Sequence, residues 1–153
     1  MVTAVNLDEV DWHILAILQA EARISFKELG HRIGLTGTAI AERVRKLEDE
    51  GVIEGYGVKL NREKLGFPVM AFLKLRVHSE HCRHLREQAI ALPEIIEMHR
   101  VVGSEYYILK IVLPSMQCLE ASLKKFLQFG AVDVSIVLST TVASKSLQKQ
   151  SSN

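Results

Sequence analysis

The stretch ISFKELGHRIGLTGTAIAERVRKLEDEGVI, residues 24–53, decides the fold of the first part of this chain. Ser25 and Thr36 each follow an apolar residue that has a second apolar residue five positions further on: Ile24 with Leu29, and Leu35 with Ile40. This spacing is typical of a helix start, where the two apolar side chains pack together and the hydroxyl accepts a hydrogen bond from an unpaired backbone N–H. Ser25 and Glu28 also have the spacing of a capping box. The stretch therefore predicts two helices.

The pattern inside this stretch predicts a helix-turn-helix. Leu29 and Ile33 give the first of the two helices a buried stripe, and Gly34 ends it. The next helix, which Gly51 closes, carries its apolar residues on one face: Ile40, Val44 and Leu47. Two helices joined by so short a turn are typical of proteins that read the major groove of DNA.

The opposite face of the second of these helices is small and basic near its start. At about 100° per residue, the residues pointing away from the predicted core are Thr38, Glu42, Arg45 and Asp49, flanked by Ala39, Ala41, Arg43 and Lys46. A slim polar surface of this kind fits a major groove about 12 Å wide. Helical units with a basic surface helix also serve as packing or protein-interaction modules, so that alternative stays open. Binding that weakens steeply with salt would favour DNA.

Further signals flank the motif. Asp8, with Leu7 before it and Trp12 after it, predicts the start of an earlier helix. The apolar stripe of that helix comprises Val10, Ile14, Leu15, Ile17 and Leu18. Residues 52–60 alternate with glycines and are expected to form a short strand or hairpin, the wing. Residues 1–60 are therefore predicted to form a winged helix-turn-helix DNA-binding domain.

These residues carry a family resemblance. Their order is Leu7-Asp8-x-x-Asp11-x-x-Ile14-Leu15, Arg23-Ile24-Ser25-Phe26-x-Glu28-Leu29, Gly34-Leu35-Thr36 and Arg43-Val44-x-x-Leu47-Glu48-x-x-Gly51-Val52-Ile53. The order closely resembles the Lrp/AsnC, or feast/famine, family of transcription regulators across residues 7–66. The resemblance implies that DNA is faced by Thr36, Thr38, Arg43, Arg45 and Lys46, with Ser25 touching a phosphate. Ala39 and Glu42, from the outward face, complete the predicted DNA-binding set.

One position departs from the family pattern. The family usually shows Ser-Pro where this chain has Thr36-Gly37. Thr36 still supplies a cap, but Gly37 lacks the preset φ that makes proline favourable at the first helical position. The resemblance therefore leaves the sequence preference at this helix start open.

The second half of the chain predicts a separate α+β domain. Residues 61–68 are a polar linker with glycine and proline. The expected strands cover residues 69–77, 95–102, 106–113 and 132–138, with helices over residues 81–92 and after Pro114-Ser115. This βαββαβ order is that of a ferredoxin-like domain, predicted here for residues 69–143. Because both helices cover one sheet face, apolar residues are expected on the other, and the pattern predicts a homodimer.

The resemblance also implies partners. In Lrp/AsnC proteins the matching region senses ligands and assembles dimers, often tetramers or octamers, so the expected partners are double-stranded DNA, further copies of this chain and a free amino acid. Amino-acid-responsive members often carry Gly-x-x-Asp where this chain has Gly103-Ser104-Glu105-Tyr106, the candidate effector site. A phenol at position 106 cannot pair with a ligand ammonium as a carboxylate does. An effector-independent, architectural protein that bends DNA is therefore the alternative.

Composition fits a globular protein with a packed core. The chain has 153 residues, 48% of them apolar, and a net charge of +1. We expect a cytoplasmic, nucleoid-associated protein, because no signal peptide or membrane-spanning run is recognisable. Cys82 and Cys118 are expected to be reduced thiols. The polar tail, residues 144–153, lacks periodicity and is expected to be mobile.

Catalytic and metal motifs find little support. The chain has no GxSxG, P-loop, GxGxxG or HExxH pattern, so neither an enzyme nor a cofactor is expected. His78, His81, Cys82 and His84 cluster at a predicted helix start, but without a standard zinc spacing, and no metal is predicted. A small-molecule-binding scaffold that uses its helix-turn-helix only for protein contacts stays an alternative.

Overall fold

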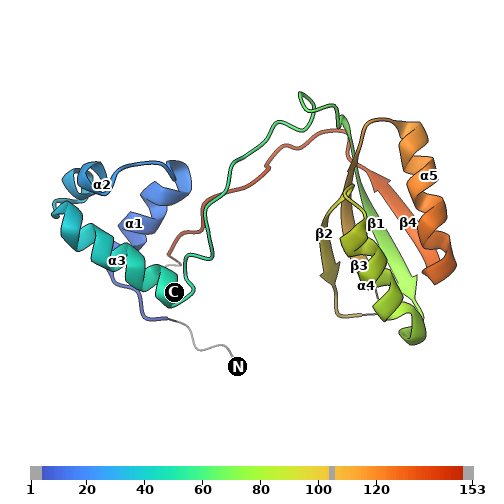
Figure 1. Ribbon diagram of the computed structural model, residues 1–153, viewed down its shortest axis with the longest axis horizontal. Helices are drawn as coiled ribbons and strands as arrows, with labels where there is room; N and C mark the ends of the chain where they lie inside the picture. The colour runs from blue at the N-terminus through green and yellow to red at the C-terminus, as the bar shows by residue number, and fades with distance from the viewer. Residues whose placement is uncertain (1–4, 104–105, 150–153) are drawn as a thin grey trace. The chain divides into compact units, whose positions relative to one another are not determined.

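The computed structural model describes residues 5–103 and 106–149 of the chain. It divides into two compact units. The first comprises Met1–Val58 together with Val142–Asn153, and the second is Lys59–Thr141 (Figure 1). Residues 142–149 thus belong to the same unit as residues 5–58.

Helices α1 (Glu9–Ala20), α2 (Phe26–Ile33) and α3 (Gly37–Asp49) build the N-terminal unit. Their apolar stripes meet in one core, whose buried members are Ile14, Leu18, Ile24, Leu29, Ile40, Val44 and Leu47. Burying each such side chain stabilises the fold by roughly 1.5–3 kcal/mol before the entropy of ordering is set against it. The stripes predicted for the helices are confirmed.

The three helix starts are capped by the expected residues, but the reciprocal capping box occurs at α1 rather than at α2. Ser25 accepts from the N–H of Glu28, and Thr36 accepts from the N–H of Ala39, each at 3.2 Å. The reciprocal capping box predicted at Ser25 is wrong, because the carboxylate of Glu28 accepts from Arg32 Nε at 3.0 Å. The reciprocal box occurs at α1 instead, where Asp8 and Asp11 each accept the other's backbone N–H.

The expected wing is not formed as a strand or hairpin. Within the described part of the chain, residues 52–60 contain no β-strand. The N–H groups of Val52 and Ile53 instead donate to the carbonyl of Leu47, at 2.8 and 3.0 Å, which turns the chain away from α3. A ladder needs a second strand for its N–H and C=O groups, and residues 61–68 provide turns rather than a strand.

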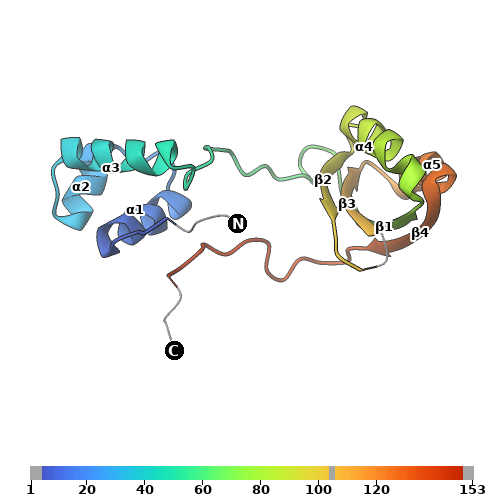
Figure 2. The same cartoon turned by 90° about the horizontal axis from the view of Figure 1, so that it is seen from below.

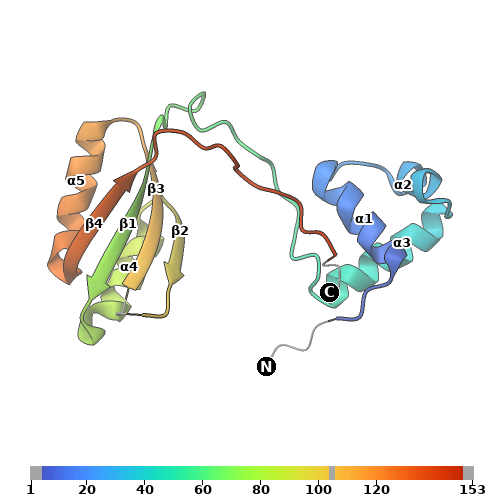
Figure 3. The ribbon, with the colours of Figure 1, turned by 180° about the vertical axis from the view of Figure 1, so that it is seen from behind.

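The C-terminal unit follows the predicted βαββαβ order. Its strands are β1 (Val69–Val77), β2 (Ile95–Arg100), β3 (Tyr106–Leu113) and β4 (Gly130–Ile136), and its helices are α4 (Cys82–Ala91) and α5 (Met116–Phe126), with 3₁₀ turns at Ser79–His81 and Leu127–Phe129. The antiparallel sheet has the order β2-β3-β1-β4, which Figure 3 shows side by side. Both helices cover the same sheet face (Figure 2), so the ferredoxin-like fold is confirmed.

The two faces of this sheet differ in composition. The helix-covered face is apolar, with Leu73, Leu75, Leu109 and Ile111 buried. The open face carries cross-strand ion pairs, Lys110 with Glu97 at 2.7 Å and Lys74 with Asp133 at 3.6 Å, between partly buried apolar residues. The open face is therefore mixed: alternation along β1 predicts Lys74 on this face, among the apolar residues expected there.

The described part of the tail makes contacts that the sequence did not indicate. Residues 142–149 run along the N-terminal unit, and the main chain of Leu147 is hydrogen-bonded to Gln19. A side-chain-to-backbone contact of this kind needs only one suitably placed amide, so it leaves no periodic pattern in the sequence. In the described residues, no helix is long and apolar enough to cross a membrane.

Candidate nucleic-acid interface

The turn between α2 and α3 is tight enough to require glycine at two positions. Gly34 ends α2 with a φ of 83°, in the left-handed region that other residues rarely adopt. Gly30 lies where a β-carbon would come within 2.5 Å of the carbonyl oxygen of Leu35. That carbonyl approaches because the N–H groups of Gly34 and Leu35 both donate to Gly30 O, at 2.8 and 2.9 Å. The close approach fixes where α3 begins.

Gly37, which stands where the family usually has proline, packs against the backbone of α2. A β-carbon at this position would lie 3.3 Å from the backbone N and Cα of Lys27, at the start of α2. Contacts of 3.3 Å are tight but could relax by a few tenths of an ångström. Gly37 therefore lets the starts of α2 and α3 pack closely, in place of the preset φ that a proline would bring.

The outward face of α3 is accessible along its length. Ile40, Val44 and Leu47 are buried against α1 and α2, whereas Thr38, Glu42, Arg45 and Lys46 are exposed and Ala39 is half-buried. Within the described residues, Arg45 forms no ion pair. Lys46 lies 3.8 Å from Glu50, an exposed pair that contributes little to stability. Both cations are therefore available to an approaching phosphate or base.

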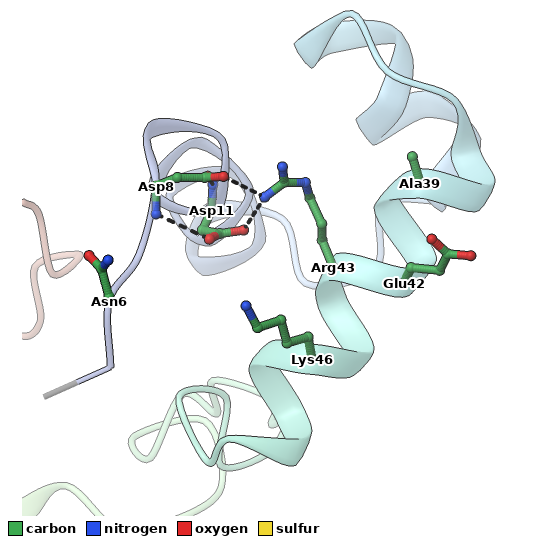
Figure 4. Close-up of a pocket in the computed structure, with 7 residues that line it drawn as sticks. All are labelled: Asn6, Asp8, Asp11, Ala39, Glu42, Arg43 and Lys46. Carbon is green, nitrogen blue, oxygen red and sulfur yellow. Dashed lines mark hydrogen bonds and ion pairs between the residues drawn. The ribbon is translucent and has the colours of Figure 1, made fainter. Parts of the chain in front are cut away.

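Arg43 is held by two carboxylates of the protein itself. Its Nη1 donates to Asp8 Oδ2 and to Asp11 Oδ1, both at 2.8 Å (Figure 4). The backbone N–H of Asp11 and, after it, Arg43 keep the pKa of Asp8 below its usual value. The hydrogen bonds that Arg43 donates to Asp8 and, after it, to Asp11 raise the pKa of Arg43. Arg43 thus links α3 to the start of α1, a role that the sequence did not predict.

A hollow of about 480 Å³ lies beside this link, lined by Asn6, Asp8, Asp11, Ala39, Glu42, Arg43 and Lys46. Figure 4 shows that Arg43 and Lys46 extend from α3 toward α1, whereas Glu42 points away. The carboxylate of Asp11 belongs to a residue only 8% exposed, and Arg43 is its cationic partner. The signal for this partnership was present in the Asp8-x-x-Asp11 spacing, but nothing in the sequence showed which residue of α3 would meet it.

Ser25 and Thr36 remain able to contact DNA. Each hydroxyl is exposed and accepts one backbone N–H as a helix cap. A hydroxyl that accepts one hydrogen bond still has its own O–H to donate, so each could donate to a phosphate oxygen. These two predicted contacts are compatible with their capping role.

The candidate effector run is only partly visible. Ser104 and Glu105 lie outside the described residues. Gly103 has a φ of 139°, and the backbone of Tyr106 begins β3 opposite Arg76. The described residues show that β2 and β3 pair antiparallel on either side of this run, and the effector site stays a prediction.

A helix-turn-helix unit joined to a ferredoxin-like domain defines a DNA-binding regulator with a separate second domain. Family models agree: the AsnC-type helix-turn-helix domain matches residues 7–48, and the Lrp/AsnC ligand binding domain matches residues 69–147. The chain belongs to the Lrp/AsnC family of transcriptional regulators. Members of this family are not enzymes.

Curated relatives and solved structures extend the likeness over nearly the whole chain. The uncharacterized HTH-type transcriptional regulator YezC of Bacillus subtilis is 38% identical over 135 residues, which are 88% of this chain and 96% of that protein. LrpB of the same organism is 34% identical over 125 residues, 82% of this chain and 84% of the relative.

Among solved structures, B. subtilis LrpC superposes with a TM-score of 0.86 at 28% identity, covering 92% of this chain and all (100%) of the other. The feast or famine regulatory protein Rv3291c of M. tuberculosis, complexed with L-methionine, has a TM-score of 0.81 at 28% identity, covering 90% of this chain and 96% of the other.

Proposed function

We propose that this regulator binds operator DNA sequence-specifically by placing the start of α3 in the major groove. The observation that carries the proposal is the division of the α3 cations: Arg43 is held by two carboxylates, while Arg45 forms no ion pair within the described residues. A guanidinium without an internal partner, on the outward face of a recognition helix, is suited to the paired acceptors of guanine or to a phosphate.

The remaining predicted residues divide by chemistry. Thr38, Ala39 and Glu42 are exposed or half-buried near the helix start, where they can contact base edges. The Thr38 hydroxyl can bond to a donor or an acceptor on a base, the Ala39 methyl can pack on the methyl group of thymine, and the Glu42 carboxylate can accept from the amino group of cytosine. Ser25, Thr36 and Lys46 suit phosphates, which position the protein without reading sequence. Arg43 is proposed to position α3 through its ion pairs with Asp8 and Asp11 rather than to contact DNA.

Homo-oligomerisation completes the proposal. The open sheet face, with its ion pairs and partly buried apolar residues, supports pairing with a second copy of this chain, and further association into tetramers or octamers follows the family pattern. A dimer would present two recognition helices to half-sites about 34 Å, or a multiple of it, apart. Such a protein would be associated with the nucleoid.

An effector is proposed for the turn between β2 and β3. The solved complex of the M. tuberculosis relative with L-methionine supports a free amino acid or a related small molecule. Tyr106 at the position of the family's aspartate favours the second candidate, an effector-independent architectural protein that bends or wraps DNA.

The test is a mobility-shift titration of the full chain on the DNA upstream of its own gene, at two salt concentrations, with and without a pool of free amino acids. Salt-sensitive binding that changes with amino acids supports an effector-responsive regulator, and binding indifferent to them supports the architectural candidate. Arg45→Ala should weaken binding, whereas Arg83→Ala, an exposed arginine of α4, should not. Absence of binding at both salt concentrations would contradict the proposal.

A further inference from the structure

A groove on the N-terminal unit is lined in part by Leu147, which belongs to the segment after β4. It has a volume of about 540 Å³ and is lined by α1, by the segment after α3 and by the tail. The lining residues include Leu7, Trp12, Leu15, Leu18, Gln19 and Leu147. All of them belong to the same compact unit, so the groove and its occupant form one structural element.

Gln19 holds the tail by its main chain. Its amide oxygen accepts from the N–H of Leu147 at 2.8 Å, and its amide nitrogen donates to the carbonyl of Leu147 at 3.0 Å. One amide that pairs with both main-chain groups of a residue imitates the edge of a β-strand and fixes the register of the docked segment.

An ion pair provides a second attachment two residues further on. Lys149 Nζ donates to Glu9 Oε1 in the first turn of α1. This hydrogen bond, together with the charge of Lys149, lowers the pKa of Glu9. The segment is therefore attached at two positions in one register, by the main chain of Leu147 and by the charge of Lys149.

We propose that this groove is a peptide-docking surface whose occupant is the chain's own segment 142–149, and that docking gives the DNA-binding unit a second, releasable connection to the assembly domain. The chain leaves the N-terminal unit after Val58 and returns to it at Val142, so the first connection is covalent and the second depends on the docked tail. The effect of docking on DNA binding rests on the proposed function, whereas the docking of segment 142–149 itself does not.

Tethering explains why so few contacts suffice. Leu147 remains 78% exposed, which for a free peptide would give negligible affinity. Attachment through a short segment after β4 raises the effective concentration to the order of mM. Docking under those conditions is stable enough to restrict the DNA-binding unit and weak enough to be released.

Hydrogen exchange of the Leu147 amide in the full chain tests the docking. We expect exchange roughly tenfold slower than for an unstructured amide, which corresponds to a tail docked about nine-tenths of the time. Gln19→Ala should abolish this protection, and α1 should persist because alanine favours helix. The matched control is Gln148→Ala, next to Leu147, because Gln148 makes no hydrogen bond among the described residues. Equal exchange in all three proteins would overturn the proposal.

Trp12 provides an independent readout. It is the only tryptophan in the sequence and lines the same groove as Leu147. Acrylamide should quench its fluorescence more strongly in Leu147→Ala and Gln19→Ala than in the wild type or Gln148→Ala. Protection of Trp12 and Leu147 that appears only as protein concentration rises would show that a second copy supplies the tail, which contradicts docking within one chain.

The second connection is tested on DNA with half-sites at varied spacing. The wild type should bind one spacing at least several-fold better than its neighbours, and Gln19→Ala should lose that preference while still binding. Identical spacing profiles for the two proteins, with Leu147 protected in the wild type, would refute the connecting role. Failure of the wild type to bind any DNA would instead refute the proposed function and leave the exchange result standing.

Discussion

Arg43 and Arg45 lie two positions apart on α3, and the structure gives them different roles that two substitutions separate. Arg43→Ala removes the cation that Asp8 and Asp11 share. The side chain of Asp11 is 12% exposed, so it would lose a charge-assisted hydrogen bond in a nearly dry site. Arg45→Ala removes an exposed side chain that, among the described residues, has no ionic partner.

The magnitudes follow from these surroundings. A hydrogen bond to a charged group contributes about 1.5–3 kcal/mol, and because the Arg43 side chain is 35% exposed, screening reduces the expected loss for Arg43→Ala to about 1–2 kcal/mol. In a unit of this size that lowers the melting temperature by roughly 4–16 °C. Arg45→Ala should leave stability within about 0.5 kcal/mol of wild type and weaken DNA binding by about 1–3 kcal/mol if it reads a base.

Thermal unfolding followed by circular dichroism, and anisotropy titration on operator DNA, measure the two effects. Arg43→Lys is the control that keeps the charge but not the forked geometry, and it should fall between wild type and Arg43→Ala in stability. The reasoning would be refuted if Arg43→Ala kept wild-type stability while losing DNA affinity, because Arg43 would then contact DNA directly.

Three further outcomes are expected. Gly30→Ala should destabilise the N-terminal unit by about 1–3 kcal/mol, because the new β-carbon would lie 2.5 Å from Leu35 O. The control is Gly57→Ala, where nothing lies within 4 Å of the new β-carbon, and equal melting temperatures of the two variants would contradict the close packing. The folded-state pKa of Asp8 lies below 3.8, so its contribution to stability is present above that pH and is lost as the pH falls through the folded-state value. In urea unfolding at pH 6 and pH 3, the free energy of unfolding should fall more for wild type than for Asp8→Asn, and equal decreases would argue against this role. Tyr106→Asp should strengthen binding of a free amino acid by about ten- to hundredfold in calorimetry, by supplying a carboxylate for the ammonium group; an unchanged affinity would place the effector elsewhere.

Local rules in the sequence predicted the helices and strands well. Thr36 and Ser25 cap helices because their hydroxyls accept a backbone N–H three residues on, a relation that involves only neighbouring residues. The buried face of α3 follows equally from the spacing of Ile40, Val44 and Leu47. The alternation of β1 likewise showed which side chains face the core.

Contacts between distant residues were not predictable in the same way. The partnership of Arg43 with Asp11 joins residues that only the packing of α3 on α1 brings together. The pairing of Gln19 with Leu147 spans almost the whole chain and uses the backbone of Leu147, which carries no sequence signal. The wing predicted for residues 52–60 is wrong for a related reason. The pattern of one strand does not show whether a second strand follows to pair with it.

The central claim is that the outward face of α3 binds operator DNA, and salt-dependent affinity tests it most directly. Anisotropy titrations of the full chain on its upstream DNA, from 50 to 200 mM salt, should show affinity falling by about 10³ or more if six to ten phosphates are contacted. Arg45→Ala should weaken binding at every salt concentration without changing assembly. Affinity that is indifferent to salt, or an Arg45→Ala variant that binds as well as wild type, would contradict the account.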